Sequence, residues 1–79
     1  MNLLNRINNY INESNFKIII GINYVNIINY DLVLDFNSNI VSVKYKDKII
    51  DIKGVNLVVN KMLKDEILIL GNINNVNFR

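Results

Sequence analysis

The sequence of 79 residues contains no cysteine, no histidine, no proline and no tryptophan. Without cysteine there is no disulfide framework and no thiolate metal site, which fits a reducing compartment. Without histidine and cysteine, the commonest general base and the commonest thiol nucleophile are both missing. These absences favour a protein that is not an enzyme.

Carboxylates are the remaining groups for acid–base chemistry. They are Glu13, Asp31, Asp35, Asp47, Asp51, Asp65 and Glu66. Most fall at predicted turns or at outward positions of predicted strands, where a solvated charge is expected. The one adjacent pair, Asp65 and Glu66, would point to opposite faces of a strand. No spacing typical of a metal site is present either, so we predict no catalytic residue, no cofactor site and no metal site.

Long hydrophobic runs are also absent. The longest uninterrupted apolar runs have three or four residues, far fewer than a membrane span needs. Polar residues interrupt the apolar ones in residues 1–10, so no signal-peptide core is formed there. We therefore expect a cytoplasmic protein. The length predicts one small domain of marginal stability, for which association with a partner would be an advantage.

Hydrophobic residues make up 51% of the chain and charged residues 20%, which is typical of a globular protein. Asparagine and isoleucine are unusually frequent, and we attribute this to an AT-rich genome because asparagine alternates with apolar residues and forms no tracts. The net charge of +2 is only a weak indication of an acidic partner.

The three glycines, Gly21, Gly54 and Gly71, each stand between two strand-like segments. We expect them to supply turns with positive φ or sharp strand bends. The pattern predicts an all-β domain of about eight short antiparallel strands, in a meander that forms a small sandwich or a partly open barrel. The short spacing of the glycines is also compatible with a β-solenoid. The predicted strands cover residues 16–20, 24–28, 32–36, the two arms of a hairpin over 40–53, 56–60, 67–70 and 73–78.

Several strands carry more specific expectations. In residues 32–36, strict alternation predicts that Leu32, Leu34 and Phe36 point inward and that Val33 and Asp35 point outward. Residues 16–20 include three consecutive isoleucines, which suggests burial on both faces, and residues 67–70 form a second strand that is apolar on both faces.

The last strand and the hairpin have predicted irregularities and pairs. Ile73 is out of phase with the apolar positions that follow it, which suggests a β-bulge near Asn74 and Asn75. The hairpin turn is placed at Asp47 and Lys48. The predicted opposite pairs are Lys46–Ile49, Tyr45–Ile50, Val43–Ile52, Val41–Gly54 and, on the other face, Lys44–Asp51.

Residues 2–11 have the apolar spacing of one helical face, so residues 1–15 are predicted to form a short N-terminal helix and loop ahead of a β-domain over residues 16–79. The apolar positions are Leu3, Leu4, Ile7, Tyr10 and Ile11. The helix would pack on the sheet, or it would dock on a partner or a membrane surface. Because residues 18–20 and 67–70 are apolar on both faces, either this helix or another chain is expected to cover the second face.

A group of lysines supports an alternative function. Lys44, Lys46, Lys48 and Lys53 cluster around one hairpin with Tyr45 between them. A basic β surface of this kind could bind single-stranded nucleic acid or anionic lipid headgroups. However, Tyr45 is predicted to point to the opposite face from Lys44 and Lys46. Its ring and these lysines would then not form one surface on which a base could stack.

The order of apolar positions and glycines also resembles that of a known family. The pattern is apolar-x-apolar-x-Gly, a short gap, apolar-x-apolar, a polar break with an acidic residue, then apolar-x-apolar-x-Gly-x-Ile and a closing aromatic. It is spelled by residues 50–59 (IDIKGVNLVV), residues 66–73 (EILILGNI) and Phe78, with residues 18–21 (IIIG) and 27–29 (IIN) at the matching places upstream. This resembles the YabP/YqfC family of sporulation proteins over about residues 16–78.

Two positions depart from the family pattern, because the chain has no proline before its first strand and has Ile28 where the family usually has glutamate. The resemblance implies a small non-enzymatic structural or adaptor protein of endospore-forming bacteria. It implies work with an integral membrane sporulation protein, on the mother-cell side, during formation of the spore envelope. It carries no catalytic or ligand-binding residues. The expected partner is therefore that membrane-anchored protein or a second copy of this chain, whereas a small molecule or a nucleic acid is not expected.

Overall fold

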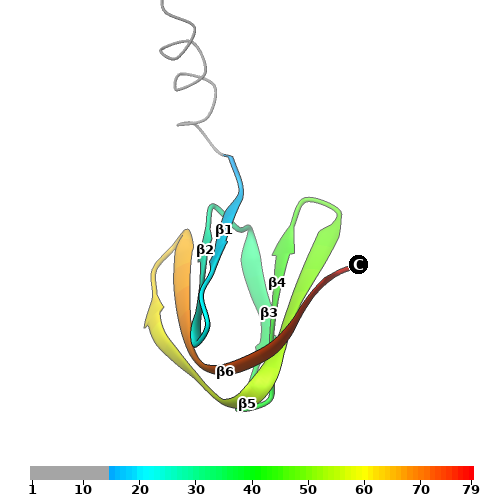
Figure 1. Cartoon of the computed structure of the whole chain (residues 1–79). Coiled ribbons are helices and arrows are strands. Elements are labelled where there is room, and N and C mark those ends of the chain that lie inside the picture. Colours follow the sequence, from blue (N-terminus) through cyan, green and yellow to red (C-terminus); the bar gives the residue numbers. More distant parts are fainter. Residues whose placement is uncertain (1–14) are drawn as a thin grey trace, which may run out of the picture.

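The computed structural model describes residues 15–79, and the helix predicted over residues 2–11 lies outside them. The strands are β1 (Lys17–Ile20), β2 (Tyr24–Ile28), β3 (Leu32–Phe36), β4 (Ile40–Tyr45), β5 (Lys48–Met62) and β6 (Glu66–Phe78). All neighbouring strands are antiparallel, and they form one open sheet in the order β1-β2-β6-β5-β4-β3 (Figure 1). The all-β antiparallel prediction is confirmed for these residues, but the sheet is neither a sandwich of two separate sheets, nor a barrel, nor a solenoid.

The predicted number of strands is wrong because two of the glycines do not end a strand. Gly54 lies within β5 and Gly71 lies within β6, and these strands have 15 and 13 residues. At these bends the two strands stay paired with each other, so four predicted strands are two long ones. Gly71 has φ of 140°, a conformation that glycine adopts at little cost, and Asn56 on β5 is left-handed with φ of 56°.

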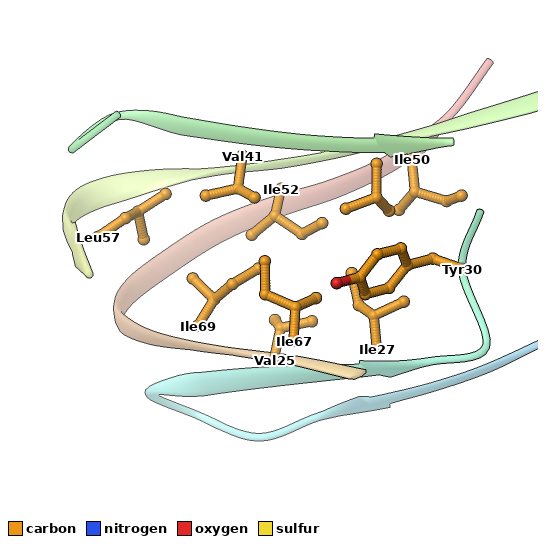
Figure 2. Close-up of a cluster of buried hydrophobic side chains, with 10 residues drawn as sticks. Val25, Ile27, Tyr30, Val41, Ile50, Ile52, Leu57, Ile67 and Ile69 are labelled. Carbon is orange, nitrogen blue, oxygen red and sulfur yellow. The ribbon is translucent and has the colours of Figure 1, made fainter. Parts of the chain in front are cut away.

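The bends in β5 and β6 fold the sheet so that its two halves face each other (Figure 1). We call the half that holds β1 and β2 the first half, and the half that holds β3 and β4 the second half; β5 and β6 contribute to both. The core lies between them (Figure 2). It consists of Val25, Ile27, Tyr30, Val41, Val43, Ile50, Ile52, Leu57, Ile67 and Ile69.

One end of the core is closed by aromatic side chains. The ring of Phe16 stacks on that of Tyr45, with 4.9 Å between the ring centroids. The hydroxyl of Tyr30 donates a hydrogen bond of 2.8 Å to the carbonyl of Leu63. Burial of this phenol, with a smaller contribution from the charge of Asp65, raises its pKa above the ordinary value for tyrosine.

The bulge predicted near Asn74 and Asn75 is confirmed. Lys53 lies opposite Asn75, while the next residue, Gly54, lies opposite Ile73. Asn74 is therefore the extra residue on β6. A single inserted residue reverses the side-chain alternation, and this is why Ile73 is out of phase with the apolar positions that follow it.

The register predicted for the β4–β5 hairpin is wrong by two residues. Tyr45 lies opposite Lys48, so the turn is formed by Lys46 and Asp47, with Lys46 in the left-handed region at φ of 55°. The observed pairs are Val41–Ile52, Ser42–Asp51, Val43–Ile50 and Lys44–Ile49. A shift of two residues leaves every side chain on its predicted face, so the hydrophobic pattern does not distinguish the two registers.

The inward and outward faces predicted for Leu32 and Val33 are also wrong, whereas those predicted for Asp35 and Phe36 are confirmed. Val33 lies opposite buried Val43 and packs against the core, whereas Leu32 and Leu34 are 46% and 45% exposed. Leu34 has no opposite residue on β4, because the register shifts between Val33 and Asp35. Leu32 and Val33, at the start of this edge strand, are both apolar. The alternation of apolar and polar residues therefore does not indicate which of the two faces the core.

Candidate functional site

Asp51 is a buried carboxylate in the second half of the sheet, on the side that faces away from the core. Asp51 is 4% exposed, and Ser42, directly opposite it, is 5% exposed. Ser42 Oγ donates to Asp51 Oδ1 at 2.6 Å, and Arg79 Nε donates to Asp51 Oδ2 at 2.6 Å. Lys44, the predicted partner of Asp51, lies opposite Ile49 instead. Sequence reasoning missed Arg79, which reaches Asp51 because the end of the chain pairs with the start of β5.

These contacts make the Ser42–Asp51–Arg79 cluster a structural one. The hydrogen bond from Arg79, followed by that from Ser42, holds the pKa of Asp51 below its ordinary value, although desolvation by burial opposes the shift. The hydroxyl of Ser42 donates to a carboxylate that is itself paired with a guanidinium, and the lowered pKa makes this carboxylate a weak base for activating the hydroxyl. The cluster satisfies a buried carboxylate and is not arranged for catalysis.

We expect Asp51→Asn to lower the free energy of unfolding by about 1–2 kcal/mol at pH 7, because it replaces a charge-assisted hydrogen bond to a partly exposed Arg79 by a weaker contact. The folded-state pKa of Asp51 is lowered, so its contribution is present above the ordinary pKa of aspartate and is lost as pH falls through the lowered value. Chemical unfolding followed at pH 7 and at acidic pH measures both effects. Asp35→Asn, at an exposed carboxylate opposite Ser42, is the control, and an equal loss in both variants would contradict the prediction.

The other carboxylates do not converge within residues 15–79. Asp31 Oδ2 accepts a hydrogen bond of 2.6 Å from the backbone N–H of Lys46, which supports the hairpin turn. Glu66 Oε2 lies 3.6 Å from Lys61 Nζ and accepts a hydrogen bond of 3.3 Å from Asn26 Nδ2. In this part of the chain no group of acidic residues could hold a metal ion, and no pocket is present.

The lysine-rich hairpin does not offer a free aromatic platform. The ring of Tyr45 is stacked on Phe16 and packs against the core, as the prediction of its face requires. Lys46 Nζ lies 5.4 Å from the centre of the same ring, and Lys44 Nζ donates to the carbonyl of Lys46. The ring that would have to stack on a base is therefore already in contact with protein groups.

Exposed apolar side chains are the most prominent surface feature of the described chain. They are Ile19, Ile20, Ile22, Tyr24, Leu32, Leu34, Phe36, Val55, Val58, Met62, Leu63, Leu70 and Phe78. These outnumber the apolar side chains of the core. Scattered apolar residues are ordinary on a protein surface, but groups of them on one strand or one face mark interaction sites.

The first such group follows the two edges of the sheet. Ile20 lies opposite Val25 and Phe36 lies opposite Val41, so both face the core side of the sheet. They are nevertheless 54% and 55% exposed. The reason is that β1 and β3 are the unpaired edges, where no neighbouring strand covers the inward side chains. The burial predicted for residues 16–20 on both faces is therefore wrong, and the core is open along both edges.

Comparisons of this chain with protein families, with curated proteins and with solved structures find no match. Residues 15–79 include no helix that is long and apolar enough to cross a membrane.

Proposed function

We propose that this protein is a non-enzymatic structural or adaptor protein that binds an extended apolar segment of a partner along β3. The observation that carries the proposal is Phe36, an inward-facing aromatic residue that is more than half exposed on an edge strand. An edge strand has a row of unpaired backbone N–H and C=O groups, to which an added strand can bond. The added strand would also cover the exposed side chains of Leu32, Leu34 and Phe36.

The composition of β3 supports an occupied edge. Proteins usually protect an exposed edge strand with lysine, proline or inward-pointing charges, because a bare apolar edge promotes aggregation. β3 has the sequence LVLDF, with Asp35 as its one charge. The bulge at Leu34 interrupts the regular hydrogen-bonding spacing, which disfavours stacking of identical edges.

The resemblance to the YabP/YqfC family supplies the identity of the proposed partner. On this proposal the chain acts in the mother cell of an endospore-forming bacterium, on the cytoplasmic side, during formation of the spore envelope. The partner is the soluble part of an integral membrane sporulation protein, which holds the chain at the membrane periphery. A second copy of the chain is the other partner that the resemblance allows.

The test uses the soluble part of a membrane sporulation protein encoded beside the gene for this chain, titrated by calorimetry. We expect saturable binding that Phe36→Asp weakens at least about tenfold, since burial of an unpaired charge in an interface costs more than 1.4 kcal/mol. Ile22→Asp is the matched control, because Ile22 is apolar and 93% exposed but lies in the β1–β2 loop. Absence of binding to the unaltered chain, or equal weakening by the two substitutions, would overturn the proposal.

A second candidate function is binding to single-stranded nucleic acid or an anionic membrane surface. It is favoured by the lysines around the β4–β5 hairpin and by the position of Lys46 over the ring of Tyr45. The same chain is titrated with an oligonucleotide and with anionic vesicles at low salt. Binding that disappears at moderate salt would favour this candidate, and no binding at low salt removes it.

A further inference from the structure

The two halves of the sheet have outer surfaces of opposite character. On the first half, Ile19, Tyr24, Val58 and Leu70 are exposed to between 36% and 58%, and Ile28 and Leu68 beside them are half-buried. We call these six residues the outer apolar face. On the second half the corresponding positions are mostly polar, and they include Ser42, Lys44, Asp51 and Lys53. Contact with water explains the mostly polar side chains on the outer surface of the second half. It does not explain the apolar side chains on the outer surface of the first half.

The residues of the outer apolar face are neighbours on the four strands β1, β2, β6 and β5. Ile19 lies opposite Asn26, which lies opposite Leu68. In the next outward-facing row, Tyr24 lies opposite Leu70, which lies opposite Val58. Side chains that are directly opposite each other lie on the same face of a sheet. The apolar side chains therefore form a patch around Asn26, which is bordered at one end by the charged residues Lys17, Lys61 and Glu66.

The chain enters the sheet at the edge of this same half. Asn15 directly precedes Phe16 and β1, and its carbonyl accepts a hydrogen bond of 2.7 Å from Asn29 Nδ2. The ring of Phe16 is on the core side, because it stacks on Tyr45. By the alternation of an extended chain, Asn15 belongs to the outer side. Asn15 thus lies at the edge of the first half, on the same side of the sheet as the outer apolar face.

We propose that residues 2–11 of the same chain cover the outer apolar face as an amphipathic helix. The apolar stripe of Leu3, Leu4, Ile7, Tyr10 and Ile11 is complementary in character to this face. A helix of ten residues is about 15 Å long. Five residues of a strand, the span from Tyr24 to Ile28, cover about 14 Å from the first to the last. Residues 12–14 are sufficient to reverse the chain between the helix and Asn15.

The attachment favours this segment over a second copy of the chain. A short tether holds the helix at an effective concentration in the millimolar range, whereas a second copy has to associate from solution. The helix need not be stable alone, because most of the stability of a short helix in a protein comes from packing of its apolar side. The β3 edge belongs to the other half of the sheet and stays uncovered when the helix is docked, so this inference does not depend on the proposed partner.

The test places a nitroxide label on the polar side of the segment. Because the chain has no cysteine, Asn5→Cys supplies a single labelling site. We expect strong paramagnetic broadening of the amide signals of Ile19, Asn26 and Leu68, and little broadening for Ser42 on the opposite outer surface. In a mixture of labelled chain and isotopically marked, unlabelled chain, we expect none of this broadening.

Two further substitutions in the labelled chain make the test specific. Ile7→Asp, within the apolar stripe, is expected to abolish the broadening and lower the midpoint of thermal unfolding, whereas Asn9→Asp, on the opposite side of the helix, leaves both unchanged. Uniform or absent broadening in the unaltered labelled chain would overturn the inference. Broadening in the mixed sample would also overturn it, because a second copy would then be the occupant.

Discussion

Replacement of Gly54 by alanine is expected to lower the free energy of unfolding by about 3–5 kcal/mol, which is a large part of the stability of a domain of this size. A Cβ at this position would lie under 3.0 Å from the backbone carbonyl oxygen of Asn72 and 2.8 Å from Leu57 Cδ2. The carbonyl belongs to β6, which is paired with β5 on both sides of the bend, so it cannot move away without loss of ladder hydrogen bonds.

The expected cause differs from the one that the sequence indicates. Positive φ among the glycines of the described chain is found at Gly71, not at Gly54. At Gly54 the requirement is space between two backbones, one of the established roles of glycine in a strand. A larger side chain is therefore excluded by close approach and not by the dihedral angles.

The control for this prediction is Gly21→Ala, measured by chemical unfolding beside Gly54→Ala. A Cβ at Gly21 would also be too close to a neighbour, but the neighbour is the ring of Tyr24. That ring is a side chain and can shift where the backbone carbonyl of Asn72 cannot, so we expect a smaller cost than that of Gly54→Ala. Equal destabilisation by the two substitutions would contradict the assignment of the larger effect to the β6 backbone.

Ile69→Ala is expected to lower the free energy of unfolding by about 2–5 kcal/mol, because it removes three buried carbon atoms and leaves a cavity. Ile69 is completely buried between the two halves of the sheet (Figure 2). It lies opposite Val25 on β2, another completely buried residue.

Ile20→Ala is the matched control, since Ile20 also lies opposite Val25 but on the edge strand β1, and is 54% exposed. We expect it to cost less than about 1.5 kcal/mol, because part of its surface is already in water and the gap can be solvated. Thermal or chemical unfolding of the two variants measures the difference. If Ile20→Ala were as costly as Ile69→Ala, the edge of β1 would be covered in solution.

Much of the local structure could be predicted from the sequence. The bounds of β2 (Tyr24–Ile28) and β3 (Leu32–Phe36) are as predicted, and so is the bulge near Asn74. These features depend on the period of the apolar residues, which is a local property of the chain. The side of β3 that faces the core was not predictable in the same way, because Leu32 and Val33 are both apolar and the choice depends on contact with Val43.

The candidate sites, too, could be predicted only in part from the sequence. The sequence indicated that residues 67–70 are apolar on both faces, and the structure places Ile67 and Ile69 in the core with Leu68 and Leu70 on the outer apolar face. It gave no indication that Arg79 meets Asp51, because that contact joins residues 28 positions apart through the pairing of β5 with the end of β6. It also did not identify β1 and β3 as edges, on which the exposure of the apolar side chains depends.

By itself, the sequence determined the class of the protein: extended segments punctuated by glycine, an apolar interior, and no histidine or cysteine for catalysis or metal binding. Only the tertiary structure decided that Gly54 and Gly71 bend two long strands and do not end four short ones, and which register β4 and β5 adopt. The physical reason is that side-chain periodicity is set by each residue and its neighbours in the chain. Strand ends, two-residue registers and free edges are set instead by which distant backbone groups form hydrogen bonds with one another.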